Sequence, residues 1–222
     1  MKYQFFAEVL IPVDGQKLDG ELIIPENAQG VVIFAHGSGS SRLSPRNQIV
    51  ARKLNEQGKG TLLFDLLTAA EDQGVQNRFN IRLLSDRLVH ATHWLRHFAP
   101  SAALPFGFFG ASTGAAAALV AASALPEIKA VVSRGGRPDL AKTNLARVTA
   151  PVLLIVGELD TAVLEWNREA LTDLNESSHL VIVPGATHLF EEPGTLEKVA
   201  HLASKWFNRH LQNKSALATI KS

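Results

Sequence analysis

Short runs of consecutive apolar residues alternate along this chain with longer stretches in which apolar residues recur every three or four positions. An unbroken apolar run of about four to eight residues is typical of a strand buried on both faces of a sheet, and the longer period is typical of a helix that buries one face. The predicted inner strands are residues 31–35, 61–65, 104–109, 128–133, 151–156 and 179–183.

The predicted helices lie between these strands. In residues 81–98, Leu84, Leu88 and Leu95 share one face at helical spacing, and Pro100 follows the last turn. Because strand and helix alternate, we expect an α/β fold with a mostly parallel sheet and helices on both faces. The predicted helices are residues 45–57, 81–98, 113–125, 162–174 and 195–210, and the stretch 135–151 has room for one short helix but not for a cap domain.

The N-terminal residues 3–10 and 18–24 flank the turn signal Val13-Asp14-Gly15, which predicts an antiparallel hairpin at the edge of the sheet. Exposed edge strands allow pairing between copies, so we expect a monomer or a homodimer. No linker or composition break divides the chain. We therefore expect one domain over residues 1–213, followed by a loosely held tail over 214–222.

Charge and targeting signals narrow the range of partners. The chain has 22 lysine and arginine residues against 21 aspartate and glutamate residues, a formal net charge of +1. Near-neutral charge gives no electrostatic reason to expect a nucleic acid or an anionic membrane as partner. The N-terminus has no signal-peptide pattern, and the apolar run 115–122 is too short to span a bilayer. We expect a cytoplasmic protein.

The chain contains no cysteine, which excludes disulfides, cysteine-ligated zinc and a thiol nucleophile. His90, His93 and His97 share a helical face, but no nearby carboxylate completes a metal site, and a solvated or partly packed face is the better interpretation. We expect neither a metal nor an organic cofactor. Covalent catalysis would then need a hydroxyl nucleophile.

One short motif offers such a nucleophile. Gly110-Ala111-Ser112-Thr113-Gly114 matches G-x-S-x-G and stands between a predicted strand and a predicted helix. In a nucleophile elbow this turn holds serine in a strained conformation above the sheet, and the glycines avoid collisions with the neighbouring strand and helix. The alternative is a glycine-rich turn in which Ser112 only caps the helix.

Two further loops at the same sheet edge supply an acid and a base. Asp160 follows the strand 151–156, and His188 follows the strand 179–183. The order Ser112, Asp160, His188 is the chain order of a Ser-Asp-His triad on a parallel sheet. Asp160 could instead cap the next helix, and Glu158 is the rival carboxylate.

The loop His36-Gly37-Ser38-Gly39 follows the first inner strand and predicts an oxyanion hole beside the elbow. The expected donors are the backbone N–H groups of Ser38 and Thr113, with His36 bracing the loop. The loop matches neither dinucleotide-binding nor P-loop patterns, so nucleotide binding is disfavoured.

With these motifs the chain resembles the α/β-hydrolase superfamily, in the small capless group around dienelactone hydrolase. The segments HGSGSSRLSPRN and TLLFDLLT are similar to dienelactone-hydrolase-like proteins, including domains fused to phosphoribosyltransferases. The resemblance implies the α/β-hydrolase fold with an eight-stranded sheet and no cap, and a triad of Ser112, Asp160 and His188. True dienelactone hydrolases carry cysteine at the elbow, so Ser112 makes this chain a serine variant whose substrate need not be dienelactone.

The expected function is a serine hydrolase that cleaves a small ester, lactone or thioester through an acyl-enzyme. Acyl transfer or perhydrolysis with the same triad, or a non-catalytic binding protein on this fold, are the alternatives. Arg42 and Arg134 are candidate contacts for an anionic substrate group, and Phe190 is a candidate for the acyl site; ion pairing and core packing are the alternatives for these side chains. The other arginines expected near this edge are Arg46, Arg78 and Arg137.

Overall fold

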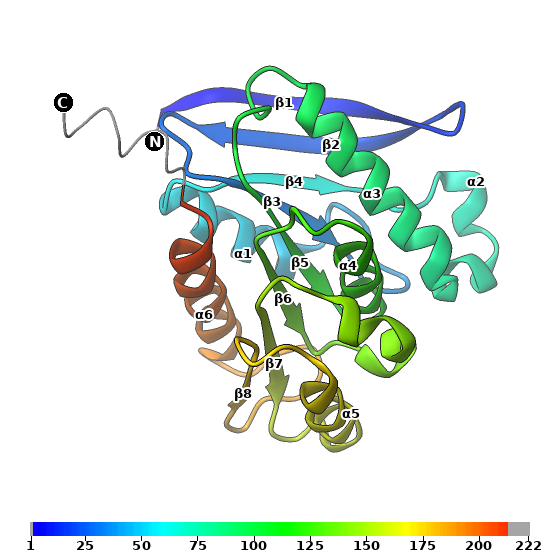
Figure 1. The fold of residues 1–222 in the computed structure, drawn as a ribbon, viewed down its shortest axis with the longest axis vertical. Coiled ribbons are helices and arrows are strands. Elements are labelled where there is room, and N and C mark those ends of the chain that lie inside the picture. The colour runs from blue at the N-terminus through cyan, green and yellow to red at the C-terminus, as the bar shows by residue number, and fades with distance from the viewer. Residues whose placement is uncertain (1, 213–222) are drawn as a thin grey trace.

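The computed structural model describes residues 2–212, which form an eight-stranded sheet in the order β1-β2-β4-β3-β5-β6-β7-β8 (Figure 1). Strand β2 is antiparallel to both of its neighbours, β1 and β4, and every other pair is parallel. The prediction of a mostly parallel sheet with an antiparallel hairpin at one edge is confirmed. The strands are β1 (Tyr3–Val13), β2 (Gln16–Pro25), β3 (Val31–Ala35), β4 (Gly60–Phe64), β5 (Phe106–Ala111), β6 (Ala130–Arg134), β7 (Val152–Gly157) and β8 (His179–Val183).

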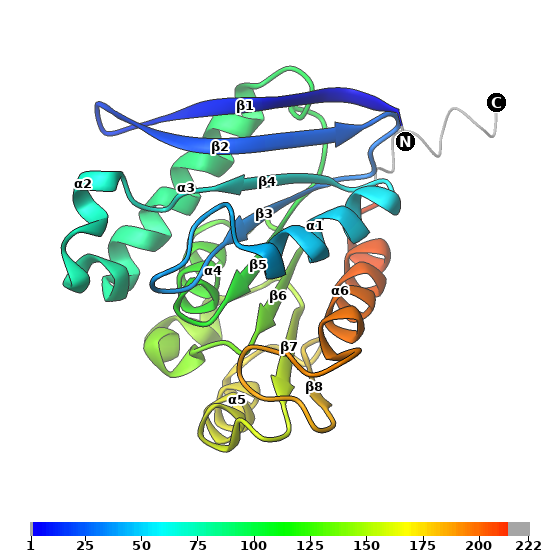
Figure 2. The same cartoon turned by 180° about the vertical axis from the view of Figure 1, so that it is seen from behind.

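Helices cover both faces of the sheet, as expected. Helices α3, α4 and α5 lie on one face, and α1 and α6 lie on the other, as the two opposite views show (Figures 1 and 2). The helices are α1 (Pro45–Glu56), α2 (Ala69–Asp72), α3 (Ile81–His97), α4 (Thr113–Ala124), α5 (Thr161–Asp173) and α6 (Thr195–His210), with 3-10 helices η1 (Val75–Phe79) and η2 (Pro138–Arg147).

The predicted bounds hold for β3, β8 and α6, while the hairpin strands are longer than predicted because their pairing continues to a tight turn at Asp14 and Gly15. Both turn residues have positive φ, 48° and 77°, the conformation that a two-residue hairpin requires. Strand β5 continues two residues beyond its predicted end, since Gly110 and Ala111 pair with β6. This extension brings the strand directly to Ser112.

Two apolar layers form the core, one on each face of the sheet. Helix α4 is the innermost helix, and its alanines from Ala115 to Ala118 are fully buried. A helix that is apolar on every side is a buried helix. Its short side chains let α4 approach the sheet closely, which places its N-terminus directly beneath the elbow.

Only η2 stands between β6 and β7, and it packs against α4 and α5. The expectation of a fold without a cap domain is confirmed, so the carboxyl edge of the sheet is covered by loops alone. No helix within residues 2–212 is long and apolar enough to cross a membrane. The predicted tail over 214–222 lies outside the described residues.

Candidate active site

Ser112 occupies the sharp turn between β5 and α4 with φ 51° and ψ −120°. A non-glycine residue at such positive φ is strained, and strain of this kind is held in place by the surrounding structure. Ser112 stands at the N-cap position of α4, yet its side chain makes no capping hydrogen bond. The alternative of a simple helix cap is therefore not what the structure shows.

The two glycines of the motif let the strand, the turn and the helix pack together. A Cβ atom at Gly110 would lie 2.4 Å from Cα of Ala115, and one at Gly114 would lie 2.2 Å from the carbonyl oxygen of Ala35. Both collisions are with backbone, which cannot move aside without unpacking the sheet. The motif is thus required by close packing around Ser112.

The carboxylate of Asp160 and the imidazole of His188 form a hydrogen bond. Asp160 precedes α5 and His188 lies in the loop after β8, and the distance from Oδ2 of Asp160 to Nδ1 of His188 is 2.6 Å. The side chain of Asp160 makes no capping hydrogen bond to α5. The rival carboxylate, Glu158, accepts a hydrogen bond from the amide of Gly185 at 2.8 Å. The structure therefore joins the predicted acid and base.

The elbow and the histidine loop meet at the end of β6. The amide of Ser112 donates to the carbonyl of Arg134 at 3.2 Å. At the next residue, Gly135, a Cβ atom would lie 3.4 Å from both Nδ1 and Cε1 of His188, so the imidazole packs against this glycine. Among the described residues the Ser112 hydroxyl makes no hydrogen bond to His188. Catalytic hydrogen bonds are often loose before substrate binds.

The histidine loop is held by a contact that the sequence reasoning missed. Glu192 accepts hydrogen bonds from the amide of Thr187 at 3.1 Å and from its hydroxyl at 2.5 Å. These bonds lower the pKa of the Glu192 carboxyl. A threonine five residues before a glutamate is not a distinctive spacing, so only the structure shows this brace next to His188.

His36 braces the loop after β3, as expected. Its Nε2 accepts a hydrogen bond from the amide of Leu66 at 3.0 Å, so the proton must sit on Nδ1, which donates to the carbonyl of Gly37 at 3.1 Å. Burial is the main cause that lowers the pKa of His36 and keeps the ring neutral. Both nitrogens are used, so His36 is not available as a second base.

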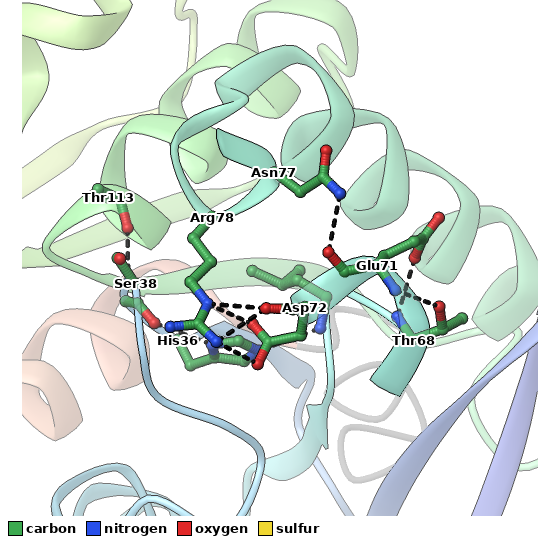
Figure 3. A network of polar contacts seen from close by, with 10 residues as sticks. His36, Ser38, Thr68, Glu71, Asp72, Asn77, Arg78 and Thr113 are labelled. Carbon is green, nitrogen blue, oxygen red and sulfur yellow. Dashed lines mark hydrogen bonds and ion pairs between the residues drawn. The ribbon is translucent and has the colours of Figure 1, made fainter. Parts of the chain in front are cut away.

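The predicted oxyanion loop contacts the elbow directly. The amide of Ser38 donates to Oγ1 of Thr113 at 2.8 Å, a bond that Figure 3 shows beside His36 and Arg78. The amide of Thr113 stands in the first turn of α4 and donates to no oxygen within residues 2–212. Of the two expected donors, the amide of Thr113 is free and that of Ser38 is engaged within the protein.

Three of the arginines expected at this edge are neutralised by carboxylates. Arg42 pairs with Asp65 at 2.5 Å, and its backbone amide donates to the same carboxylate at 2.7 Å. Arg78 pairs with Asp72 at 2.8 Å, and Arg137 pairs with Asp139 at 2.7 Å. The alternative of ion pairing thus describes these three side chains. For Arg42, the charge expected to meet a substrate is already matched.

Arg134 differs from these three arginines. Its side chain is buried, with 8% of the residue exposed, and within the described part of the chain it makes no hydrogen bond or ion pair. Burial and then the nearby positive charge of Arg46 lower the pKa of Arg134 to about 10. Arg46 is bonded to the exposed carboxylate of Glu191 at 3.2 Å. A buried guanidinium without a counterion is costly.

Phe190 lies in the core and not at the open edge. Only 1% of the residue is exposed, and it belongs to the apolar layer beneath α1 and α6. The alternative of core packing therefore describes Phe190, and a contact with an acyl group is not available to a ring buried this deeply.

A groove of about 310 Å³ runs beside the oxyanion loop. His36, Ser40 and Ser41 from that loop face Asp65 and Thr68 from the segment after β4, so the lining is largely polar. No group of three histidine, aspartate or glutamate side chains suited to a metal ion occurs within residues 2–212.

Comparisons with known proteins agree with this fold. The model of the dienelactone hydrolase family matches residues 18–213. A crystal structure of a dienelactone hydrolase from Anabaena variabilis is 53% identical, with a TM-score of 0.92 over 96% of this chain and 100% of that one. Est1E from Butyrivibrio proteoclasticus is 18% identical with a TM-score of 0.78, over 91% of this chain and 98% of that one, a likeness of fold alone.

Curated relatives from Mycobacterium tuberculosis carry the provisional name phosphoribosyl transferase. They are 54% identical over 205 residues, which is 92% of this chain and 46% of their own length. The chain therefore spans about half the length of these relatives, and their name describes longer proteins.

Proposed function

The chain belongs to the dienelactone hydrolase family and is an α/β-hydrolase, and from that premise we propose that it is a serine hydrolase that cleaves a small ester, lactone or thioester. The nucleophile in this proposal is Ser112, the base is His188 and the acid that orients the base is Asp160. The hydrogen bond of 2.6 Å between Asp160 and His188, made beside the elbow, is the observation that carries the proposal.

The proposed reaction has two halves. Nε2 of His188 takes the Ser112 proton as Oγ attacks the acyl carbon, and the resulting imidazolium then protonates the leaving group. In the second half His188 activates a water molecule that releases the acyl group from Ser112. Asp160 holds the proton of His188 on Nδ1 and stabilises the imidazolium in both halves.

The oxyanion formed in each half needs donors at the elbow. The free amide of Thr113 at the N-terminus of α4 is well placed for one of them, and the helix dipole adds to its effect. The Ser38 amide stays a predicted donor, although in the structure it donates to Thr113 Oγ1.

The environment of Arg134 supports the proposal that the substrate carries an anionic group. It is the buried guanidinium without a partner in the described residues, and its carbonyl is bonded to the amide of Ser112. A carboxylate or phosphate on the substrate would supply the missing counterion. Arg42 and Phe190 drop out of the proposed substrate contacts, because Asp65 neutralises the first and the core encloses the second.

A fluorophosphonate probe together with short p-nitrophenyl esters tests this function. We expect the probe to label Ser112, and Ser112→Ala and His188→Ala to abolish turnover of the esters. Ser177→Ala, an exposed loop serine, is the matched control and should label and turn over as the wild type does. A wild-type protein that is not labelled at Ser112 would leave a binding protein on the hydrolase fold as the better description.

A further inference from the structure

We propose that the side-chain hydroxyl of Thr113 donates a hydrogen bond to the oxyanion, in the position expected for the Ser38 amide. The inference rests on the proposed serine hydrolase function and concerns the same site. It gives Thr113 two donors to one oxygen, its backbone N–H and its Oγ1–H.

The first observation is the direction of the Ser38 amide. This N–H donates to Oγ1 of Thr113 at 2.8 Å, across 75 residues of sequence, and thereby ties the loop after β3 to the elbow (Figure 3). A backbone amide has one proton, and here that proton is directed at a protein oxygen. It is therefore not aimed at a bound substrate.

The second observation concerns the proton of the Thr113 hydroxyl. A threonine hydroxyl has one donor and two acceptor positions, and Thr113 uses an acceptor position for Ser38. Within residues 2–212 its Oγ1 donates to no protein oxygen, although 98% of the residue is buried, since its exposed fraction is 2%. A buried donor without an acceptor is unfavourable, so an acceptor supplied by a ligand would satisfy it.

Other threonines in and around helices of this protein do spend that proton. Thr92 donates to the carbonyl of Leu88, Thr172 to that of Glu169 and Thr195 to that of Glu192, at 2.8, 2.7 and 2.7 Å. Thr113 has no such partner because the residues before it belong to β5 and the elbow. One lone pair of Thr113 Oγ1 thus accepts the hydrogen bond from Ser38, while the hydroxyl proton stays available for donation.

The arrangement suits a charge that appears during the reaction. Electron density would pass from the breaking carbonyl π bond to its oxygen, and the bond from Oγ1–H to that oxygen would strengthen as the tetrahedral intermediate forms. The Ser38 amide would polarise the hydroxyl from behind, since hydrogen bonds in a chain reinforce one another. Ser38 would then act as a positioning residue and Thr113 as the donor.

The variant Thr113→Val separates this proposal from its rival. It preserves shape and the backbone N–H but removes the hydroxyl, and we expect kcat to fall by about 10²- to 10³-fold with little change in KM. Thr113→Ser restores the hydroxyl and should remain within a few-fold of the wild type. If the Ser38 amide is the true donor and Thr113 only occupies it, Thr113→Val would free that amide, and kcat would be unchanged or higher.

A second measurement does not depend on how the variant folds. In a crystal structure of the wild-type protein with a phosphonyl group on Ser112, the phosphoryl oxygen should lie within about 3 Å of both Oγ1 and N of Thr113. An oxygen bonded to the Ser38 amide instead, with the Thr113 hydroxyl turned away, would overturn the proposal.

These experiments also separate this inference from the proposed function. Thr172→Val, a matched change on the exposed face of α5, should keep wild-type kcat. Wild-type protein that the probe does not label at Ser112 contradicts both proposals. Labelling of Ser112 with undiminished turnover in Thr113→Val contradicts the role of the hydroxyl alone.

Discussion

Asp160 bonds Nδ1 of His188 at 2.6 Å, while Glu158, two residues earlier on the same loop, bonds the amide of Gly185. Two neighbouring carboxylates are thus assigned to different partners, one to the imidazole and one to the backbone of the loop that carries it. A carboxylate on Nδ1 keeps the proton there and leaves Nε2 as an acceptor, which is the tautomer that a general base requires.

The variant Asp160→Asn should therefore lose activity, because asparagine no longer holds the proton of His188 on Nδ1. By analogy with the serine protease triad, we expect kcat to fall by about 10⁴-fold while the fold is retained. Glu158→Gln keeps a hydrogen-bond acceptor for Gly185 and should remain near wild-type kcat. Steady-state kinetics on a short ester measures both, and equal losses in the two variants would contradict the assignment of Asp160.

The strained backbone of Ser112 predicts a difference between two inactive variants. Ser112→Gly relieves the strain at φ 51°, whereas Ser112→Ala retains a Cβ atom and the strain with it. We expect the glycine variant to be more stable than the alanine variant by about 1 kcal/mol in urea unfolding. An alanine variant as stable as the glycine variant would mean that the elbow stores no such strain.

Removal of Arg134 and of Arg42 should shift stability in opposite directions. Arg134→Met replaces a buried charge that has no partner among the described residues, so we expect the free energy of unfolding to rise by about 1–3 kcal/mol. Arg42→Met leaves Asp65 without its cation and should lower that free energy by about 1 kcal/mol. Urea unfolding of both variants measures the two signs.

The same Arg134→Met variant tests the anionic substrate group. KM for an ester that bears a carboxylate should rise at least about tenfold, the change that loss of about 1.4 kcal/mol produces, while KM for a neutral ester changes little. A variant that is destabilised, and that treats both esters as the wild type does, would show that Arg134 is a structural side chain.

His36 should make the protein less stable in acid. Burial lowers the pKa of His36 below its ordinary value of 6.5. As the pH falls, the unfolded state therefore binds a proton more readily than the folded state does, which favours unfolding. The contribution is complete above pH 6.5 and is lost as the pH falls below it. His36→Gln should be less stable at pH 8 but should lose less stability than the wild type between pH 7 and pH 5.

Exposed His93 provides the control for this pH dependence. Urea unfolding of His93→Gln should follow the wild-type pH dependence, because this side chain is exposed and folding does not bury it. A His36→Gln variant whose stability falls with acid as steeply as that of the wild type would contradict the role given to burial.

Features of the fold that depend on local sequence patterns could be predicted from the sequence. The unbroken apolar runs predicted the inner strands, and the order of strands brought Ser112, Asp160 and His188 to one edge because the carboxyl ends of parallel strands meet there. The helices between Ala69 and Phe79 were missed because they are short and have no buried face. Their one local signal is the capping box of Thr68 and Glu71.

Contacts between segments that are distant in the sequence could not be predicted in the same way. The bond from Ser38 to Thr113 joins residues 75 positions apart, and its direction depends on a side-chain rotamer. Whether an arginine meets a carboxylate also depends on packing, since Arg42 faces Asp65, whereas Arg134 has no partner among the described residues. Such pairings follow from the completed fold.

The position of β8 at the edge of the sheet has a consequence for how the site fails. Ser112 follows β5, which is paired on both sides, whereas His188 follows β8, which is paired only with β7 and buries one of its five residues fully. Regions with few buried contacts open locally at lower cost than the centre of a fold. The proposed nucleophile and the proposed base thus belong to regions of unequal local stability, and we expect local opening of this one edge to disable the site while the centre of the molecule remains folded.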